Sequence, residues 1–221
     1  MIIKALVAVR SGSVRVQNKN LRPFAGSSLL EVKLAQLKRL KGLDGVIVNS
    51  NDETMLEIGK KMGCQTVLRD PFYASNSVSM SDVYKNMAEN CDCDVIAYIN
   101  CTNPLIKDQT IEYAIEKFCN MDGFDSLNSA HLIKEFMFFN NKPVNYDLLH
   151  QPRSQDLPDY YALNFAVSII SRENMILNKN VVGKKPFIFG IDEIEATDID
   201  NPIDFEFAEY VYKNYYLMSN K

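Results

Sequence analysis

Short apolar runs rich in β-branched residues alternate with amphipathic helical segments along the first three quarters of this chain. The strand-like runs span residues 2–9, 45–49, 65–68 and 94–100. The helical segments between and after them span residues 28–40, 53–62, 79–90 and 108–119. Strands that alternate with helices of about ten residues need crossover connections, and such connections build parallel sheets. The alternation therefore predicts an α/β fold with a mainly parallel sheet flanked by helices.

The alternation stops after about residue 126. Residues 131–170 are rich in Phe, Asn, Tyr and Pro, with strand-like runs at 136–139 and 163–170 and three prolines between them. We interpret 131–170 as a flap inserted into a single domain that covers residues 1–221. A strand at 187–190 and a closing helix at 204–216 follow, and Asn201 and Pro202 suit the N-cap and first position of that helix.

Composition limits the classes of function. The 221 residues carry a net charge of −4, which argues against bulk nucleic-acid binding. The sequence has no run of about 18 apolar residues, so no membrane span is expected, and the apolar start at 2–9 is too short for a signal peptide. The five cysteines are an odd number, which favours reduced thiols in a cytoplasmic protein. Cys91 and Cys93 have no second Cys/His pair nearby, so zinc is not expected.

Polar side chains fall at the carboxyl ends of four of the predicted strands: Arg10, Asn49, Arg69 and Asn100. Ligands of open parallel sheets bind in the crevice outside the carboxyl ends of the strands. These residues therefore outline one predicted ligand crevice.

The loop after the first strand has the composition of a phosphate-binding nest. Three cations lie within ten residues: Arg10, Arg15 and Lys19. Small residues that turn tightly and supply N–H and hydroxyl donors lie among them: Ser11, Gly12 and Ser13. The loop is neither a Walker A loop nor a G-x-G-x-x-G fingerprint. A solvated basic loop is the alternative, but the position after the first strand of a parallel sheet favours phosphate binding.

Asp198 and Asp200 lie just before the closing helix. In an extended segment, two residues at this spacing point their side chains to the same face. Mg²⁺ is often held by one or two carboxylates together with substrate phosphates. A solvent-facing acidic pair ahead of a helix is the alternative. The phosphate-type loop favours the metal.

The loop at 10–20 resembles the signature A-R-x-x-S-K-x-x-x-x-K-N of the cytidylyltransferases that activate eight- and nine-carbon acidic sugars. Arg10, Ser13, Lys19 and Asn20 match it, whereas Val14 stands where the family has lysine. Further segments resemble family motifs in order along nearly the whole chain: 47–52 (I-V-S-T-D-D), 67–75 (R-P…L-A-x-D), 99–105 (L-Q-P-T-S-P-L), 151–158 (P-R-x-Q-x-L-P), 164–166 (N-G-A) and 198–200 (D-I-D).

This resemblance implies a nucleotide-diphospho-sugar transferase-like fold and a reaction of CTP with a sialic-acid-like 2-keto-3-deoxy sugar acid. The products would be a CMP-sugar and pyrophosphate. The implied catalytic residues are Arg10, Lys19 and Asp200, with Mg²⁺ on Asp198 and Asp200. The implied nucleotide-binding residues are Arg10, Ser11, Gly12, Ser13, Arg15, Lys19, Asn20, Arg69 and Ser79. The implied sugar-binding residues are Asn100, Arg153, Gln155 and Asn164, and Arg153 suits a carboxylate because a guanidinium can bind it with two parallel bonds.

The resemblance also implies that the flap is an arm that packs against a second subunit, which predicts a homodimer. Asn100 and Phe165 replace a family Gln and Gly, which favours a sugar other than N-acetylneuraminate. Two alternatives stay open. One is a 3-deoxy-manno-octulosonate cytidylyltransferase. The other is a catalytically inactive nucleotide- or sugar-binding relative, for which the uncharged Val14 is the main support.

Overall fold

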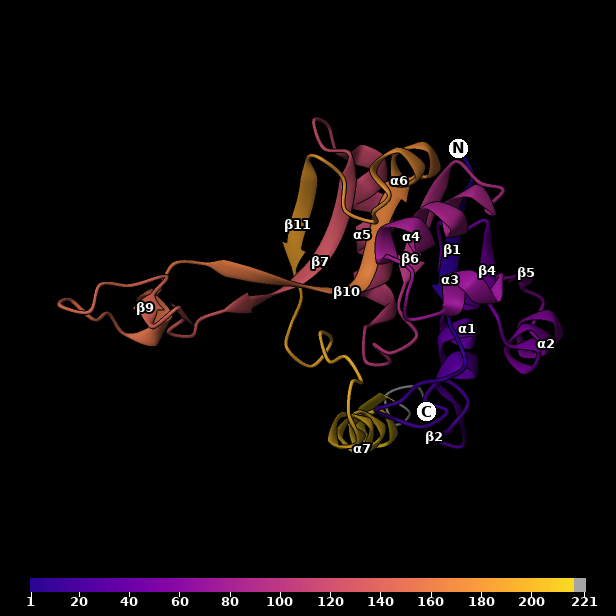
Figure 1. Cartoon of the computed structure of the whole chain (residues 1–221), viewed down its shortest axis with the longest axis horizontal. Helices are drawn as coiled ribbons and strands as arrows, with labels where there is room; N and C mark the ends of the chain where they lie inside the picture. Colours follow the sequence, from indigo (N-terminus) through magenta and orange to yellow (C-terminus); the bar gives the residue numbers. More distant parts are fainter. Residues whose placement is uncertain (217–221) are drawn as a thin grey trace.

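A seven-stranded sheet forms the centre of the computed structural model, which describes residues 1–216 (Figure 1). Its order is β11-β7-β10-β6-β1-β4-β5. The strands are β1 (Ile3–Ala8), β4 (Gly45–Ser50), β5 (Gln65–Leu68), β6 (Val95–Ile99), β7 (Ser126–Ile133), β10 (Tyr160–Ser171) and β11 (Pro186–Gly190). Only β10 runs antiparallel to its neighbours, β6 and β7. The predicted mainly parallel α/β sheet is confirmed.

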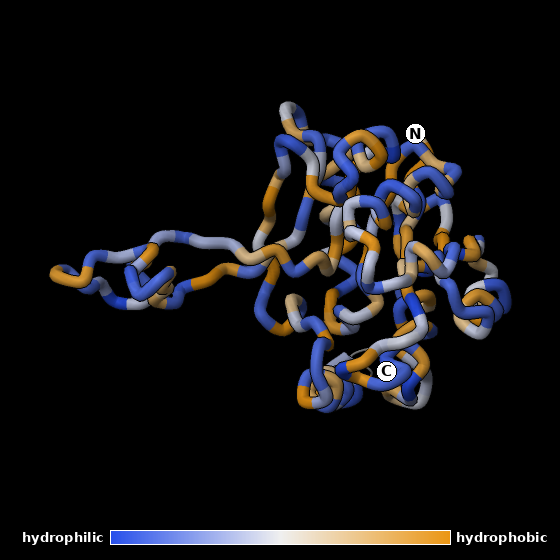
Figure 2. Tube along the Cα trace, in the orientation of Figure 1, coloured by the Kyte–Doolittle hydropathy of each residue, from blue (hydrophilic) through white to orange (hydrophobic). Residues whose placement is uncertain are grey.

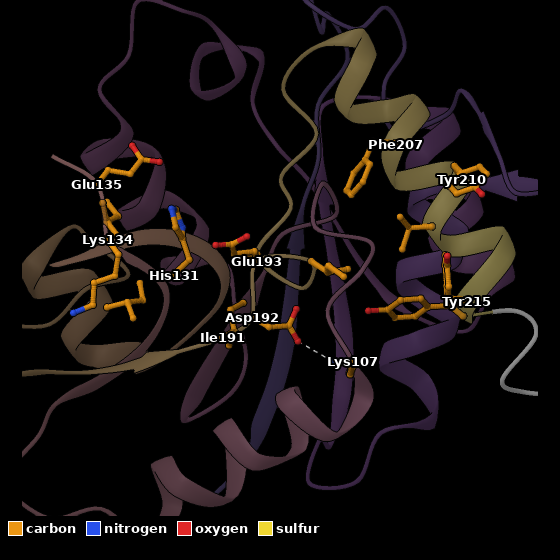
Figure 3. Close-up of a pocket in the computed structure, with 16 residues that line it drawn as sticks. Lys107, His131, Lys134, Glu135, Ile191, Asp192, Glu193, Phe207, Tyr210 and Tyr215 are labelled. Atoms are coloured by element: carbon orange, nitrogen blue, oxygen red, sulfur yellow. Dashed lines mark hydrogen bonds and ion pairs between the residues drawn. The ribbon is translucent and has the colours of Figure 1, made fainter. Parts of the chain in front are cut away.

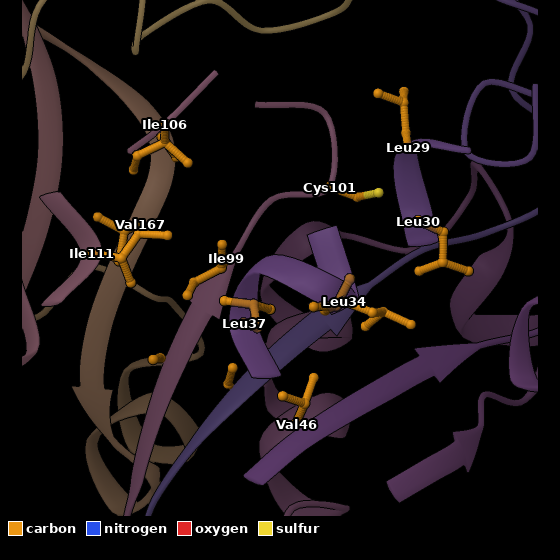
Figure 4. Close-up of a cluster of buried hydrophobic side chains, with 14 of the residues drawn as sticks. Leu29, Leu30, Leu34, Leu37, Val46, Ile99, Cys101, Ile106, Ile111 and Val167 are labelled. Carbon is orange, nitrogen blue, oxygen red and sulfur yellow. The ribbon is translucent and has the colours of Figure 1, made fainter. Parts of the chain in front are cut away.

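Helices cover both faces of the sheet. They are α1 (Leu29–Arg39), α2 (Glu53–Lys61), α3 (Pro71–Ala74), α4 (Met80–Glu89), α5 (Asp108–Asn120), α6 (Arg172–Asn178) and α7 (Pro202–Val211). One apolar core joins the sheet to α1, α2, α5 and α7 (Figure 4), and a second joins it to α4 and α6. Strand β1 contributes side chains to both cores, because Ala5 and Val7 point to the first and Leu6 to the second.

Polar caps set the starts of the helices near the predicted positions. Ser28, Asp52 and Ser79 each accept a backbone N–H in the first turn of α1, α2 and α4. Asn201 and Asp204 form a capping box around the start of α7. The predicted helix 204–216 is corrected at its end, because α7 stops at Val211 and a π-helical turn covers 212–216. No helix of residues 1–216 is long and apolar enough to cross a membrane.

Strand β7 was not predicted, because polar residues fill its inward positions. Ser126 and Asn128 are fully buried, and each is hydrogen-bonded. The Ser126 hydroxyl donates to Asn128 Oδ1 at 2.9 Å, and Asn128 Nδ2 donates to the carbonyl of Val181 at 3.0 Å. Such partners come from the tertiary fold, so a local pattern of hydrophobicity does not show the strand.

The chain between β7 and β10, residues 134–159, forms an arm that extends away from the body (Figure 1). It contains two-residue strands, β8 (Phe138–Phe139) and β9 (Lys142–Pro143), so the strand predicted at 136–139 is shorter than expected. The predicted flap bounds 131–170 are too wide. The end of β7 and all of β10 up to residue 170 belong to the main sheet, where Tyr160 pairs with Ile133 and Ile170 with Ser126. Figure 2 shows hydrophobic residues at the outer end of the arm.

Candidate active site

A cavity of about 300 Å³ lies at the carboxyl ends of β1 and β6. Seven of the predicted site residues line it: Arg10, Ser13, Arg15, Lys19, Asn20, Asn100 and Asp200. The structure thus brings the basic loop and the acidic segment together, although Arg15 and Asp200 are 185 residues apart in the sequence. The crevice expected at the strand ends is present.

The basic loop is fixed at both ends. Near its start, Ser11 N–H donates to Asn51 Oδ1 at 3.2 Å, and Asn51 Nδ2 donates to Ser11 Oγ at 2.9 Å. Gly12 has φ +81°, a conformation that L side chains rarely adopt, which explains glycine there. Near its end, Asn18 has φ +52° and its carbonyl accepts the N–H groups of Leu21 and Arg22 at 2.9 and 2.8 Å. The loop's own hydrogen bonds therefore define its backbone.

The three cations of the loop bind protein oxygens. Arg10 donates to the carbonyl of Ala74 at 2.6 Å and to Asn76 Oδ1 at 3.0 Å. Arg15 donates to Asp200 Oδ1 at 2.7 Å. Lys19 donates to the carbonyl of Ile199, and its Nζ lies 4.0 Å from Asp200 Oδ1. A triphosphate would have to replace some of these contacts, and the half-exposed pair of Arg15 and Asp200 is the kind that contributes little stability.

Asp198 has an orphaned acceptor. Its Oδ1 is buried and has no hydrogen-bond partner within the described chain. Burial raises the pKa of Asp198 above its usual value, a hydrogen bond from Thr102 opposes this rise, and the Asp200 charge adds to it. A partnerless buried carboxylate oxygen beside a second carboxylate suits a hard cation. No group of three or more His, Cys, Asp and Glu gathers among residues 1–216, so phosphates and water would complete the coordination.

The acidic segment is held from both sides. The N–H of Ile199 donates to the carbonyl of Thr102 at 2.9 Å, which ties the segment to the loop after β6. The N–H of Asp200 donates to Asp204 Oδ2 at 2.8 Å, which ties it to the first turn of α7. The positions of both carboxylates are therefore set by neighbouring elements.

Arg69 is buried and does not belong to the lining of the cavity. It is only 4% exposed, and it donates to Asn49 Oδ1 at 2.6 Å and to the Asn49 carbonyl at 2.8 Å. Burial lowers the pKa of Arg69, and the nearby Arg10 charge lowers it further. A guanidinium stays protonated under such conditions. Arg69 therefore braces the end of β4 and adds positive charge near Arg10.

Several predicted residues lie outside the cavity lining. Ser79 caps α4, where its hydroxyl donates to Asp82 Oδ2 at 2.9 Å. Asn164 is buried at an irregularity of β10, and its Oδ1 accepts from Ser129 Oγ at 2.6 Å and from the N–H of Ala166 at 3.1 Å. Arg153 and Gln155 belong to the arm. Arg153 is the N-cap of the 3₁₀ turn Ser154–Asp156, and Gln155 lies within that turn. One chain alone does not bring these residues to the cavity.

Asn76 and Thr102 were not predicted as site residues, yet both line the cavity. Asn76 lies in the polar stretch 75–79 between α3 and α4, where the sequence has no helical or strand periodicity. Thr102 lies inside the segment 99–105 that resembles a family motif. The position of that motif directly after a strand was the signal available for Thr102.

A larger hollow of about 1450 Å³ lies between the start of the arm and α7 (Figure 3). His131 and Lys134 line it on one side, and Phe207 and Tyr210 on the other. Lys107 reaches across the edge of this hollow to Asp192 Oδ2 at 2.9 Å and to Glu195 Oε1 at 2.7 Å. Among the described residues, none of the predicted site residues lines this larger hollow.

The sheet and the cavity define an α/β nucleotidyltransferase. Residues 4–221 match the family model described as cytidylyltransferase. The chain belongs to this cytidylyltransferase family.

Individual relatives are similar to this chain over most of its length. The chain is 26% identical to "Post-translational flagellin modification protein B" of Campylobacter coli, over 96% of this chain and 95% of that protein. It is 25% identical to the pseudaminic acid cytidylyltransferase of Campylobacter jejuni, over 94% and 95%. It is 27% identical to the N-acylneuraminate cytidylyltransferase of Oncorhynchus mykiss, over 94% of this chain but only 49% of that longer protein.

Solved structures share the fold. A CMP:2-keto-3-deoxy-manno-octonic acid synthetase complexed with CTP superposes with a TM-score of 0.70 at 14% identity, covering 100% of this chain and 99% of that one. A 4-diphosphocytidyl-2C-methyl-D-erythritol synthase of Anaerococcus prevotii superposes with a TM-score of 0.71 at 12% identity, covering 98% and 96%. At such identities the likeness shows the nucleotidyltransferase fold alone.

Proposed function

We propose that this cytidylyltransferase activates a sialic-acid-like 2-keto-3-deoxy sugar acid with CTP, giving a CMP-sugar and pyrophosphate. The meeting of the basic loop with Asp200 in one cavity carries the proposal, and the buried Asp198 lies two residues before Asp200, outside the lining. The names of the relatives, which include pseudaminic acid and N-acylneuraminate cytidylyltransferases, support the class of sugar.

The anomeric hydroxyl of the sugar would attack the α-phosphorus of CTP, with pyrophosphate leaving. Transfers of this kind depend mostly on positioning and on neutralising charge. Arg10, Arg15 and Lys19 lie on one loop at the cavity, so they would hold the triphosphate and stabilise the departing pyrophosphate. Arginine would make forked contacts, and lysine would act as a movable point charge. Asn20, whose buried Oδ1 lacks a partner in the described chain, would accept a hydrogen bond from the nucleotide.

Asp198 and Asp200 would hold Mg²⁺, and the partnerless oxygen of Asp198 supports this role. When bound, the ion would neutralise phosphate charge and lower the pKa of the attacking hydroxyl. The chain's own contribution is to keep the two carboxylates fixed beside the basic loop, through Thr102 on one side and Asp204 on the other.

Phe165 and Asn100 support a sugar other than N-acetylneuraminate. Phe165 has φ +54°, the left-handed region in which glycine is favoured, and the resembling family has glycine there. Its ring packs against the second apolar core, which contains Tyr98 of β6. Asn100 lines the cavity with a side chain one methylene shorter than the family's Gln. The shorter Asn100 side chain would change the shape of the cavity, whereas Phe165 is a second departure from the resembling family and packs against the core.

We further propose a homodimer formed through the arm. The arm carries exposed apolar side chains, of which Phe139 is 71% and Leu149 86% exposed. Arg153 and Gln155 lie on the same arm, and they would meet a sugar only in an assembly that brings an arm to a cavity. A cytoplasmic location stays a prediction from the cysteine count.

Pyrophosphate release tests the proposal. Purified protein would be incubated with CTP, Mg²⁺ and one sugar acid at a time: N-acetylneuraminate, pseudaminate, a diacetylated legionaminate and 3-deoxy-manno-octulosonate. We expect release with a nine-carbon acid and the mass of the corresponding CMP-sugar. Release with the eight-carbon acid alone would replace the substrate class, and CTP binding without release for any acid would favour the inactive relative.

A further inference from the structure

Lys33 is a fully buried lysine in the helix behind the site. It lies on α1 and is 1% exposed, although lysine is almost never fully buried unless it is paired. Leu30 and Leu34, its neighbours on α1, belong to the apolar core that also contains Cys101, the second residue after β6 (Figure 4). An ammonium group in such surroundings needs a structural reason, because burial without partners is costly.

Lys33 holds the loop that follows β6. Its Nζ donates to the carbonyl of Asn103 at 3.0 Å and to Gln36 Oε1 at 2.7 Å. Gln36 in turn donates to the carbonyl of Ile106 at 2.7 Å and to Asp108 Oδ1 at 3.0 Å. Two side chains of one helix therefore fix the backbone of the loop at residues 103 and 106.

The same loop holds the acidic segment. Asn103 is fully buried, and its Nδ2 donates to the carbonyl of Thr197 at 3.0 Å and to that of Ala196 at 3.4 Å. One residue earlier, the carbonyl of Thr102 accepts the N–H of Ile199. These bonds flank Asp198. A continuous series of hydrogen bonds thus leads from Lys33 to the carboxylate pair.

We propose that Lys33 is a positioning residue for the metal-binding carboxylates: through Asn103 it fixes the loop on which the segment bearing Asp198 and Asp200 docks. The inference rests on the proposed function, because that function assigns a metal to these carboxylates. Lys33 touches no substrate in this arrangement. Its loss would leave the carbonyl of Asn103 and the amide oxygen of Gln36 without their donor inside the core, and the loop would shift or take up water.

The test compares Lys33→Met and Asn103→Ala with Lys38→Met, a control on the same helix. Lys38 also donates to a backbone carbonyl, that of Met62, but it lies away from the cavity. Mn²⁺ would be titrated into each full-length variant with CTP bound, and binding followed by water-proton relaxation, which needs no turnover. We expect Mn²⁺ affinity to fall about tenfold in Lys33→Met and Asn103→Ala, and to be unchanged in Lys38→Met.

The double variant Lys33→Met/Asn103→Ala should be no weaker than the weaker single variant, because both act in one series. Wild-type Mn²⁺ affinity in Lys33→Met would overturn the inference, even where its melting temperature falls, because a merely structural role predicts that result. Should Lys33→Met not fold, Asn103→Ala alone decides. Failure of the proposed function would appear separately, as a wild-type protein that binds Mn²⁺ and CTP but releases no pyrophosphate.

Discussion

Val14 and Arg15 are adjacent residues that both line the cavity, but Val14 is uncharged and Arg15 is positively charged. Val14 is 87% exposed and uncharged, whereas Arg15 pairs with Asp200 at 2.7 Å. Both side chains of that pair are about half exposed or more, so solvent screens the interaction and a phosphate could replace the carboxylate. Arg15 is therefore free to supply the charge that the family's lysine would supply.

Arg15→Gln should raise the KM for CTP by about tenfold, because one phosphate contact from a guanidinium is lost. Val14→Lys in the same variant should restore most of that loss. Steady-state pyrophosphate release against CTP concentration measures both. Leu177→Lys, a charge added at an exposed apolar position on α6, is the control that should restore nothing. An unchanged KM in Arg15→Gln would show that Val14 is not compensated by its neighbour.

Lys33 should leave a signature in the pH dependence of stability. Burial lowers the pKa of Lys33 from 10.5 to about 8, although Cys101 and Asp108 oppose the shift. Between these two values the unfolded chain binds the extra proton, so the folded state gains stability as pH rises. The gain from Lys33 between pH 7 and pH 9.5 is about 2 kcal/mol.

Urea unfolding at the two pH values measures this contribution as the difference between wild type and Lys33→Met. Other groups that titrate in this range cancel in the difference. We expect the wild type to gain about 2 kcal/mol relative to the variant. Equal pH responses of wild type and Lys33→Met would mean that Lys33 titrates normally.

At the scale of elements, helix α7 and the acidic segment form one unit. Asp204 accepts the N–H groups of both Asp200 and Asn201, and Asn201 accepts those of Ile203 and Asp204. The capping box therefore sets the start of the helix and the position of Asp200 together. This part was predictable, because Asn, Pro and Asp at these spacings are local signals for a helix start.

Asn201→Ala should lower stability by about 1 kcal/mol, the usual effect of losing an N-cap. It should also raise the Mg²⁺ concentration needed for half-maximal activity, because Asp200 loses part of its support. Ser171→Ala removes the N-cap of α6 in the same way, away from the cavity. It should cost similar stability and leave the Mg²⁺ dependence unchanged. A change of Mg²⁺ dependence in neither variant, or in both, would contradict the coupling.

Other elements were hidden from the sequence for physical reasons. Strand β7 places Asn128 and Ser126 in the core. Asn128 bonds Val181, 53 residues away, and Ser126 bonds Gly183, 57 residues away. Asn164, for which a sugar-binding role stays a prediction, bonds Ser129 through its Oδ1 where β10 is irregular. Contacts of this range leave no periodic trace in the sequence. The strands β1, β4 and β5, by contrast, are short apolar runs and were found close to their bounds.

At the level of the whole molecule, the arm is the surface through which we propose that the homodimer forms. It projects from the body (Figure 1) and exposes apolar side chains such as Phe139 and Leu149, and contiguous exposed apolar surface is typical of interaction sites. Light scattering after size-exclusion chromatography should give about twice the chain mass of 25.2 kDa.

Phe139→Glu with Leu149→Glu should shift the protein to one chain mass, because both side chains are exposed on the arm and charge opposes their burial. Leu177→Glu, 70% exposed on α6, is the control and should leave the mass unchanged. A wild-type protein of one chain mass at working concentration would contradict the proposed homodimer. It would also leave Arg153 and Gln155 without a route to the cavity.

We propose above that the basic loop and the acidic segment form one catalytic centre. Pyrophosphate release by Asp200→Asn, with the sugar acid that the wild type uses, tests it most directly. The variant keeps the shape of the side chain and removes its charge. The account predicts a fall in kcat of about 100-fold or more with CTP binding retained. Activity near that of the wild type would contradict the account, because Asp200 would then hold neither the metal nor the geometry of the site.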